Sequence, residues 1–250
     1  MYWLAAAVPF VVVLLAWSIL TYSSYVQPLF LPTPTDVFSA IFQLIKSGEL
    51  FTHIWVSVYR VMLGFVLAAI FAVPLGILMG SFKIVQAVIE PINDFVRYLP
   101  VVAFIPLAIL WTGTGDLEKV LIIFIGTFFQ LVLMTMENAR AVPNEYLEVA
   151  YTLGGLRWAA IWRVLVPAAL PNVFDSLRVA SGWAWSYLVV AEIVAANRGL
   201  GFLIIQSQRF LKTADIIAGI IVIGLLGLLL DFTFRRLSRL LFPWAVQDRP

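Results

Sequence analysis

Cysteine is absent from this chain of 250 residues, and histidine occurs once, at His53. Without cysteine the chain has no disulfide, no catalytic thiol and no cysteine-ligated metal. One histidine cannot build a metal cluster by itself. Because His53 stands just before an apolar run, we expect it to lie at a membrane interface. The sequence therefore predicts no metal site.

Charged residues are also scarce, at 12% of the chain, while hydrophobic residues make up 62%. Soluble domains carry about 25% charged residues and about half apolar residues, glycine included. A soluble protein of this length could not bury so much apolar surface, so we expect an integral protein of a lipid membrane. The formal net charge of +2 is too weak a bias to indicate a nucleic-acid partner. The length fits a single domain, residues 1–250.

A cleavable leader is not indicated either. The first apolar run, from Leu4 to Leu20, has no basic segment before it. No small-residue cleavage site follows it, since the next stretch reads "TYSSYVQPLFLPTP". We therefore expect this run to be a retained transmembrane helix.

Long apolar runs are what the sequence has in abundance. Crossing the hydrocarbon core takes about 20 apolar residues. The third run contains Pro91, Pro100 and Pro106, which predict kinks or a broken helix. The runs are too long for barrel strands and lack strict alternation, so we expect an all-α fold. The six predicted spans are about 4–22, 54–80, 85–111, 118–139, 173–196 and 214–234.

The distribution of lysine and arginine predicts the orientation, because these residues concentrate on the cytoplasmic side. We expect both termini to be cytoplasmic. The inner segments then carry Lys83, Arg140, Arg157, Arg163, Arg235, Arg236, Arg239 and Arg249. The outer segments carry Lys46, Arg198, Arg209 and Lys212, with Lys119 at an outer edge.

The segment between the first two spans predicts an interfacial helix over residues 35–47. Thr35 or Asp36 can cap it. Apolar residues then recur at helical spacing, which is typical of a helix lying in the outer membrane interface. They are Phe38, Ile41, Phe42 and Ile45.

A longer polar stretch, "ENARAVPNEYLEVAYTLGGLRWAAIWRVLVPAALPN", follows the fourth span. Asn144 is a candidate N-cap, and Glu145 and Glu148 suit the first turn of a helix. Gly154 or Gly155 can take the left-handed conformation that ends it. A second helical piece is expected to end at a proline, Pro167. By composition alone the stretch is either a connecting loop at the lipid surface or a helix that docks into a partner protein.

The spacing of this stretch resembles the signature of the permeases of binding-protein-dependent ATP-binding-cassette (ABC) importers. That signature reads E-A-A, three residues, G, nine residues, then I-x-L-P. Here Glu148-Val149-Ala150 is followed by Gly154 and then by Val164-Leu165-Val166-Pro167. Val149, Val164 and Val166 depart from the signature but remain apolar. The segments "RYLPVVAFIPLAILWTGTG" and "LVVAEIVAANRGLGFLI" resemble the nitrate/sulfonate/taurine branch, and the resemblance extends over almost the whole chain.

The resemblance implies the type I ABC importer permease fold, with residues 145–154 as a coupling helix held in a cleft of an ATPase subunit. The permease is not an enzyme and binds no cofactor. ATP and Mg are used by the partner subunit, and no G-x-x-x-x-G-K-[ST] loop occurs in this chain. The residues implied in coupling are Glu145, Tyr146, Glu148, Ala150, Tyr151, Gly154 and Pro167.

The resemblance also implies partners and a location. They are two nucleotide-binding ATPase subunits, an extracytoplasmic substrate-binding protein and a second permease copy, in a homodimer or in a heterodimer with a close relative. The location is the bacterial inner membrane. The solute is expected to be a small anion of the nitrate, bicarbonate, sulfonate or taurine class. The alternative solute is a small aromatic compound or a pyrimidine precursor.

Polar side chains inside spans are candidates for the translocation pathway, because they are costly in lipid unless they face a cavity or a partner. Arg97 either faces the pathway or pairs with Glu90 or Asp94, and Glu192 belongs to an outer gate or pairs with Arg198. Arg60 is expected only to extend towards the membrane surface. The candidates are Arg97, Gln130, Ser181, Trp183, Ser186 and Glu192, each of which can also serve packing.

Two other classes of protein are alternatives, namely a membrane enzyme and a self-contained secondary transporter. A membrane enzyme needs a nucleophile with a base, or a metal cluster, and this chain offers little to build either. A self-contained secondary transporter usually shows internal repeats and broken helices. No repeat is visible here, and only one span is broken by prolines.

Overall fold

The computed structural model describes residues 2–23 and 25–245, with side chains from residue 8 onwards. All regular structure in this range is helical, which confirms the predicted all-α class. Met1, Pro250 and Arg249, on which the predicted orientation partly depends, lie outside the described residues. The chain forms two compact units, Met1–Val58 with Glu192–Leu225, and Tyr59–Ala191 with Leu226–Pro250.

The first unit contains α1 (Tyr2–Tyr22), α2 (Pro34–Lys46), α10 (Leu200–Arg209) and parts of three longer helices. The N-cap of α2 is Thr33, so the prediction of Thr35 or Asp36 was wrong. Thr33 Oγ1 accepts from the Asp36 N–H at 3.2 Å, and Asp36 Oδ2 accepts from the Thr33 N–H at 3.1 Å. This reciprocal capping box fixes the start of α2, and Pro34 fits the first helical position.

The apolar face of α2 remains uncovered. Phe38 and Phe42 are each 66% exposed, whereas Val37, Ala40 and Leu44 on the other side are buried. Trp17 of α1 donates from Nε1 to the Pro32 carbonyl at 3.0 Å and so ties α1 to the segment before α2. An exposed apolar face on a capped surface helix is what the interfacial prediction requires.

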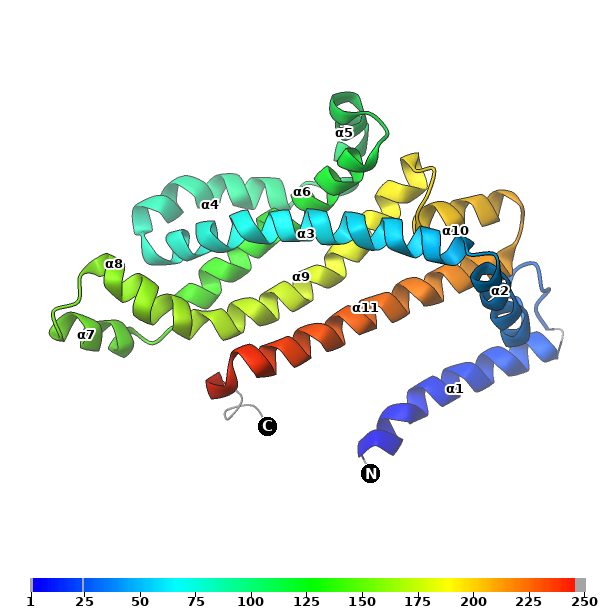
Figure 1. Ribbon diagram of the computed structural model, residues 1–250, viewed down its shortest axis with the longest axis horizontal. Coiled ribbons are helices and arrows are strands. Elements are labelled where there is room, and N and C mark those ends of the chain that lie inside the picture. The colour runs from blue at the N-terminus through cyan, green and yellow to red at the C-terminus, as the bar shows by residue number, and fades with distance from the viewer. Residues whose placement is uncertain (1, 24, 246–250) are drawn as a thin grey trace. The chain divides into compact units, whose positions relative to one another are not determined.

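The second unit contains α4 (Lys83–Arg97), η1 (Val101–Phe104), α5 (Ile105–Thr112), α6 (Asp116–Arg140), α7 (Asn144–Thr152), α8 (Arg157–Ala160), the π-helical η2 (Ile161–Leu165) and η3 (Pro243–Ala245). Three longer helices contribute residues to both units: α3 (Glu49–Ser81), α9 (Val166–Ala195) and α11 (Thr213–Leu241). Figure 1 shows the helices in chain order, with α7 and α8 forming a hairpin before α9.

Small residues bring α3 and α6 close together within the second unit. A Cβ atom on Gly64 would lie 2.7 Å from Ile123 Cβ, and one on Gly76 would lie 2.6 Å from both Thr135 Cβ and the Val132 carbonyl. Small residues four apart let helix backbones approach closely in membranes. The stripe on α3 consists of Gly64, Ala68, Ala72, Gly76 and Gly80.

The third predicted span is broken. It consists of α4 and the η1–α5 segment, which meet at a bend of 89°. Pro91 lies inside α4 and does not end it. The break falls at Tyr98–Pro100, where Pro100 takes extended backbone before η1.

The helix after α7 does not end at Pro167, so that prediction was wrong. The chain stays helical from Arg157 through η2 into α9, and Pro167 lies in the first turn of α9. A proline ring clashes with the carbonyl four residues earlier in an α-helix. The preceding π turn widens the helix and shifts its hydrogen bonds by one residue, which makes room for the ring. Pro171, which stands just before the predicted span of 173–196, likewise lies inside α9.

Within the described residues, three helices are long and apolar enough to cross a membrane, namely α3, α6 and α11. Two bent pairs also qualify if each counts as one span: α4 with η1–α5, and α8–α9 with α10 at 46°. The part of α1 whose side chains are described, Val8–Tyr22, is apolar but shorter. Six spans with an interfacial α2 therefore remain our proposal for this chain.

Candidate functional site

The start of α7 is set by Pro143. This residue occupies the N-cap position and Asn144 is already helical, so the prediction of Asn144 as N-cap was wrong. Proline suits a helix start because its fixed φ matches the helix and its missing N–H is not needed there. Glu145 lies in the first turn, where the helix dipole favours a negative charge.

The double glycine ends α7, and its two members act differently. Gly154 has φ +80°, which confirms the predicted left-handed position. Its N–H donates to the Tyr151 carbonyl at 2.9 Å, and the Gly155 N–H donates to the Ala150 carbonyl at 2.9 Å. A Cβ atom on Gly155 would lie 2.6 Å from the Ala150 oxygen, whereas one on Gly154 would meet nothing within 4 Å. Gly155 therefore closes the turn, and Gly154 faces open space.

The two faces of α7 differ in character. Leu147 packs on a buried cluster formed by Ile77, Ala139, Ile161 and Leu165. The opposite face exposes an acidic and apolar surface that includes Leu153, which is 83% exposed, and beyond it Leu156 is 79% exposed. Within the described residues Glu145 and Glu148 form no ion pair. We call this surface the outer face of α7; it consists of Glu145, Tyr146, Glu148, Val149, Leu153 and Gly154.

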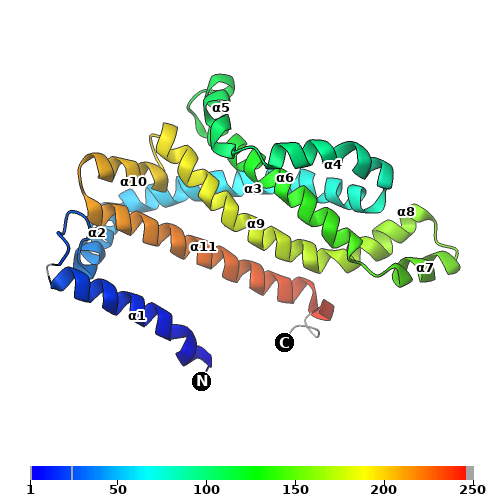
Figure 2. The same ribbon diagram turned by 180° about the vertical axis from the view of Figure 1, so that it is seen from behind.

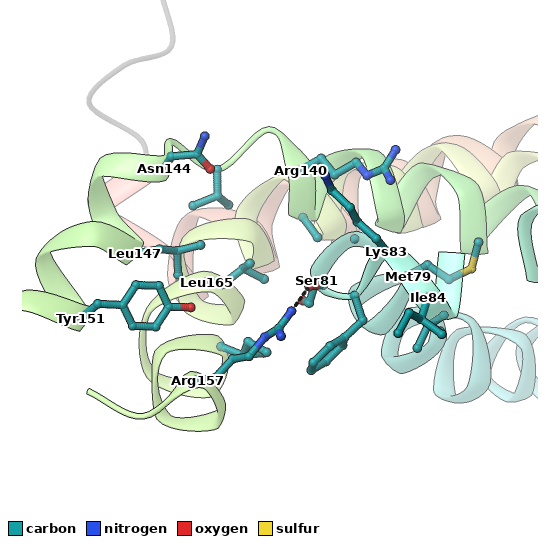
Figure 3. Close-up of a pocket in the computed structure, with 16 residues that line it drawn as sticks. Met79, Ser81, Lys83, Ile84, Arg140, Asn144, Leu147, Tyr151, Arg157 and Leu165 are labelled. Atoms are coloured by element: carbon teal, nitrogen blue, oxygen red, sulfur yellow. Dashed lines mark hydrogen bonds between the residues drawn. The ribbon is translucent and has the colours of Figure 1, made fainter. Parts of the chain in front are cut away.

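The α8 segment is attached to the junction of α3 and α4. Arg157 donates from Nη2 to the Ser81 carbonyl at 3.3 Å, as Figure 3 shows, and its guanidinium lies 4.5 Å from the centre of the Phe82 ring. The same ring lies 5.5 Å from the ring of Trp158. These contacts attach the hairpin of α7 and α8 to the α3–α4 junction of the second unit. The outer face of α7 therefore lies on a hairpin that is held in place.

Two of the predicted pathway residues, Arg97 and Gln130, line one cavity of about 390 Å³ in the second unit. The break after α4 places Arg97 at its wall, and α6 contributes Gln130. Arg97 Nε also lies 3.0 Å from Asp94 Oδ1, and Arg97 Nη2 donates to Tyr98 Oη at 3.0 Å. Arg97 thus lines a cavity and also forms the expected ion pair with Asp94, and its place in the pathway stays a prediction.

The other predicted pathway residues lie elsewhere. Ser181 is buried and donates to the Arg178 carbonyl at 2.6 Å, and Ser186 is exposed and lies 3.5 Å from the Gly182 carbonyl. Trp183 is half-buried. None of these three side chains is among those that line the Arg97 cavity. The structure therefore brings together only part of the predicted set.

Glu192 belongs to a buried polar cluster of the first unit. Its carboxylate accepts from Ser57 Oγ at 2.9 Å and from the Gly201 N–H at 2.8 Å. Ser57 Oγ accepts from the Leu200 N–H at 2.8 Å, and His53 Nδ1 accepts from the Gly199 N–H at 3.0 Å. These groups cap α10, which lies beside the first part of α3 in both ribbon views (Figures 1 and 2). His53 is therefore buried among these groups, and its predicted position at the depth of the membrane interface stays a prediction.

Arg60 does not extend to a membrane surface, because its side chain is only 6% exposed and pairs with Asp116. Arg60 Nε donates to Asp116 Oδ1 at 2.8 Å. Lys119, predicted at an outer edge, is also fully buried and lies 2.7 Å from Glu118 Oε2. Both cations are thus held inside the second unit by carboxylates of α6.

Sequence reasoning missed two residues at the Arg97 cavity, Tyr187 and Gly126. A Cβ atom on Gly126 would lie 2.5 Å from the Tyr187 ring, so the glycine makes space for the aromatic side chain. Asn93 supports the same region by donating from Nδ2 to the Phe129 carbonyl at 3.1 Å. The polar groups of Tyr187 and Asn93 inside predicted spans could have identified these residues as candidates for the cavity.

Comparison with known proteins gives the family. Residues 72–246 match the family described as binding-protein-dependent transport system inner membrane component. The taurine transport system permease protein TauC of Escherichia coli (strain K12) is 34% identical over 238 residues, covering 93% of this chain and 86% of that protein. The nitrate import permease protein NrtB of Synechocystis sp. is 31% identical over 246 residues, covering 95% and 88%.

The fold also matches a solved structure, an inward-facing conformation of the MetNI methionine ABC transporter. The TM-score is 0.71 at 18% identity, with 78% of this chain and 96% of that chain covered. The chain therefore belongs to the inner membrane components of binding-protein-dependent transport systems. Within them it is a permease of the nitrate/sulfonate/taurine branch of ABC importers and not an enzyme.

Proposed function

We propose that two copies of this chain form the membrane pathway of an ATP-driven importer for small anions of the nitrate, bicarbonate, sulfonate or taurine class. An external binding protein delivers the solute, and two ATPase subunits hydrolyse ATP with Mg. Relatives named for taurine and for nitrate transport support this class of solute. Taurine carries a sulfonate and nitrate is an oxyanion, so negatively charged oxygens are what the two solutes share.

The outer face of α7 is the observation that carries the proposal. Its acidic and apolar side chains are exposed, although the inner face of the same helix is packed on the core. Exposed aromatic and apolar residues at the end of a supported hairpin suit insertion into a protein cleft. Glu145 and Glu148, which form no ion pair within the described part of the chain, can meet basic residues there, and the open space at Gly154 lets a partner backbone approach.

The Arg97 cavity supports an anionic solute. The guanidinium of Arg97, the amide of Gln130 and the hydroxyl of Tyr187 belong to side chains that line it. In a low-dielectric surrounding a cation attracts an anion far more strongly than it does in water. Asp94 offsets part of that charge. Partial compensation suits transport, because a solute must be bound weakly enough to leave.

The orientation follows from the same assignment. If α7 meets an ATPase in the cytoplasm, the ends of α3 and α6 at Ser81 and Arg140 lie on the cytoplasmic side. The interfacial α2 and the capped α10 then lie on the outer side, where a binding protein docks. Both termini are cytoplasmic in this arrangement.

Substitution of Gly154 by aspartate tests the docking surface, and Gly48 provides a matched control. Both glycines have nearly equal backbone angles, with φ +80° and φ +78°, and a Cβ atom on either meets nothing within 4 Å. The conformational cost of a side chain, about 1 kcal/mol, is therefore the same at both sites. We expect Gly154→Asp to lower co-purification of the ATPase subunit at least tenfold, and Gly48→Asp to leave it within about twofold.

The measurement is pull-down of the ATPase subunit from detergent without the binding protein, so that outer docking does not enter. ATP-driven uptake in proteoliposomes gives the second readout for Gly154→Asp. Equal recovery of the ATPase by the two variants would count against the coupling role of α7.

A further inference from the structure

A large basic cavity lies between the α3–α4 junction and the hairpin of α7 and α8, all within the second unit. Its volume is about 840 Å³. Figure 3 shows Lys83, Arg140 and Arg157 around it, with Asn144 and Tyr151 of α7 on the opposite wall. The cavity includes no residue of the outer face of α7 or of the Arg97 cavity, and Tyr151 is the one residue implied in coupling that lines it.

The positive charge of this basic cavity is not neutralised. No aspartate or glutamate is among the residues that the structure places on its wall. Arg157 donates to the Ser81 carbonyl and stacks on Phe82, and Arg140 donates to the amide oxygen of Gln86. These partners are neutral. Across the part of the chain that the structure describes, Lys83 forms no ion pair.

Much of the remaining wall is apolar and continues to the surface. Met79 at the end of α3 and Leu147 of α7 line the inside. Ile84 also lines the cavity and is 81% exposed, and Trp158, which packs on Phe82, is 57% exposed. Tryptophan beside basic residues at the end of a membrane-spanning helix is typical of the depth of lipid headgroups. The cavity therefore joins a cationic rim to an apolar surface.

We propose that this basic cavity binds an anionic phospholipid, with the phosphate among Lys83, Arg140 and Arg157 and an acyl chain along Ile84. The cytoplasmic position of the cavity rests on the proposed function. Basic pockets between spanning helices on that side are suited to anionic headgroups. A free phosphate ion would satisfy the cations but would leave the apolar wall in water. The amphipathic lining therefore favours a lipid over inorganic phosphate.

Native mass spectrometry of the purified permease tests the proposal with three probes: phosphatidylglycerol, phosphatidylcholine and inorganic phosphate. The cavity variant is Lys83→Gln with Arg140→Gln. The control variant is Arg236→Gln with Arg239→Gln, because these two arginines are exposed on α11 and do not line the cavity. Each basic residue that lies beside the anionic headgroup strengthens its binding about fivefold. We expect the cavity variant to bind phosphatidylglycerol on the order of 25-fold more weakly, and the control variant to bind it as the parent does.

Charge-keeping substitutions, Lys83→Arg with Arg140→Lys, separate lost recognition from lost structure. This variant is expected to retain phosphatidylglycerol binding within about threefold, since each basic residue keeps its contribution. Loss of binding in this variant, with thermal unfolding unchanged, would contradict a role for charge.

Four further outcomes would overturn the lipid assignment. The first is equal weakening of phosphatidylglycerol binding in the cavity and control variants, and the second is binding of phosphatidylcholine as tight as that of phosphatidylglycerol. The third is inorganic phosphate that binds as tightly as the lipid, which would make the site a phosphate site. The fourth is stoichiometric displacement of the lipid by added ATPase subunit, which would make the cavity part of the protein interface. None of these measurements uses ATP-driven uptake or a Gly154 variant, so their failure leaves the Gly154 test of the proposed function untouched.

Discussion

Two arginines in apolar helices have different surroundings and therefore different expected roles. Arg60 is almost fully buried and bound to Asp116 through two of its nitrogen atoms. Arg97 lies at a helix break beside a cavity and shares its charge with Asp94. A buried cation that loses its carboxylate is costly, whereas a cation at a cavity can meet a solute.

We therefore expect alanine substitutions to separate stability from transport. Arg60→Ala should lower the free energy of unfolding by about 2 kcal/mol, because it removes charge-assisted hydrogen bonds at a buried site. Arg97→Ala should leave the yield of monodisperse protein within about twofold and reduce anion uptake at least tenfold. The measurements are size-exclusion yield, thermal unfolding in detergent, and uptake in proteoliposomes. A parallel loss of yield and uptake for Arg97→Ala would show a structural role instead.

The residue scale also marks a limit of sequence reasoning. The pattern identified Arg97 and Gln130 as polar residues in apolar runs, and the structure places both on one cavity. It could not identify the partner of Arg60, because Asp116 lies 56 positions away along the chain. Tyr187 was missed for a related reason, since the space for its ring is provided by Gly126 of another helix. Contacts between distant segments carry no local periodicity.

At the scale of elements, the packing of α3 on α6 depends on small residues. A Cβ atom on Gly76 would fall within 3.0 Å of three atoms of α6, so any side chain there forces the two helices apart. Gly227 of α11 offers the opposite surroundings, with nothing within 4 Å of an added Cβ atom. Comparing the same substitution at the two positions separates the cost of steric overlap between α3 and α6 from the helix propensity of the new residue.

Gly76→Val is expected to destabilise the permease by about 1–3 kcal/mol through overpacking. Gly227→Val introduces the same β-branched residue in a helix, and we expect it to change stability by less than about 1 kcal/mol. Thermal unfolding of the two purified variants in one detergent makes the comparison. A Gly227→Val variant as unstable as Gly76→Val would remove the case for close packing of α3 on α6.

Element boundaries were predictable where local chemistry determines them. Gly154 takes the left-handed conformation expected after α7, and Gly155 closes the turn beside it. Pro167 misled the prediction, because the π-helical η2 in front of it lets the helix continue. The cap of α2 was off by two residues, since Thr33 and Asp36 complete a reciprocal pair that Thr35 does not. Helix existence followed from composition, whereas exact ends depended on hydrogen-bond geometry.

For the whole molecule, the resemblance of the signature from Glu148 to Pro167 led to the family, and the comparisons confirm it. Composition alone indicated a membrane protein and could not distinguish a permease from a membrane enzyme. The solute class comes from relatives and from the Arg97 cavity, not from any single motif. In the proposed account this chain supplies the pathway and the docking surface, while other subunits supply ATP hydrolysis and solute capture.

Reconstitution of the transporter in proteoliposomes tests this central claim most directly. The permease is assayed alone, with its ATPase subunits, and with both the ATPase subunits and the binding protein, using radiolabelled taurine and nitrate. We predict no uptake and no ATP hydrolysis by the permease alone, and ATP-dependent uptake of at least one of these two solutes only in the complete assembly. Uptake by the permease alone under an ion gradient would contradict the account.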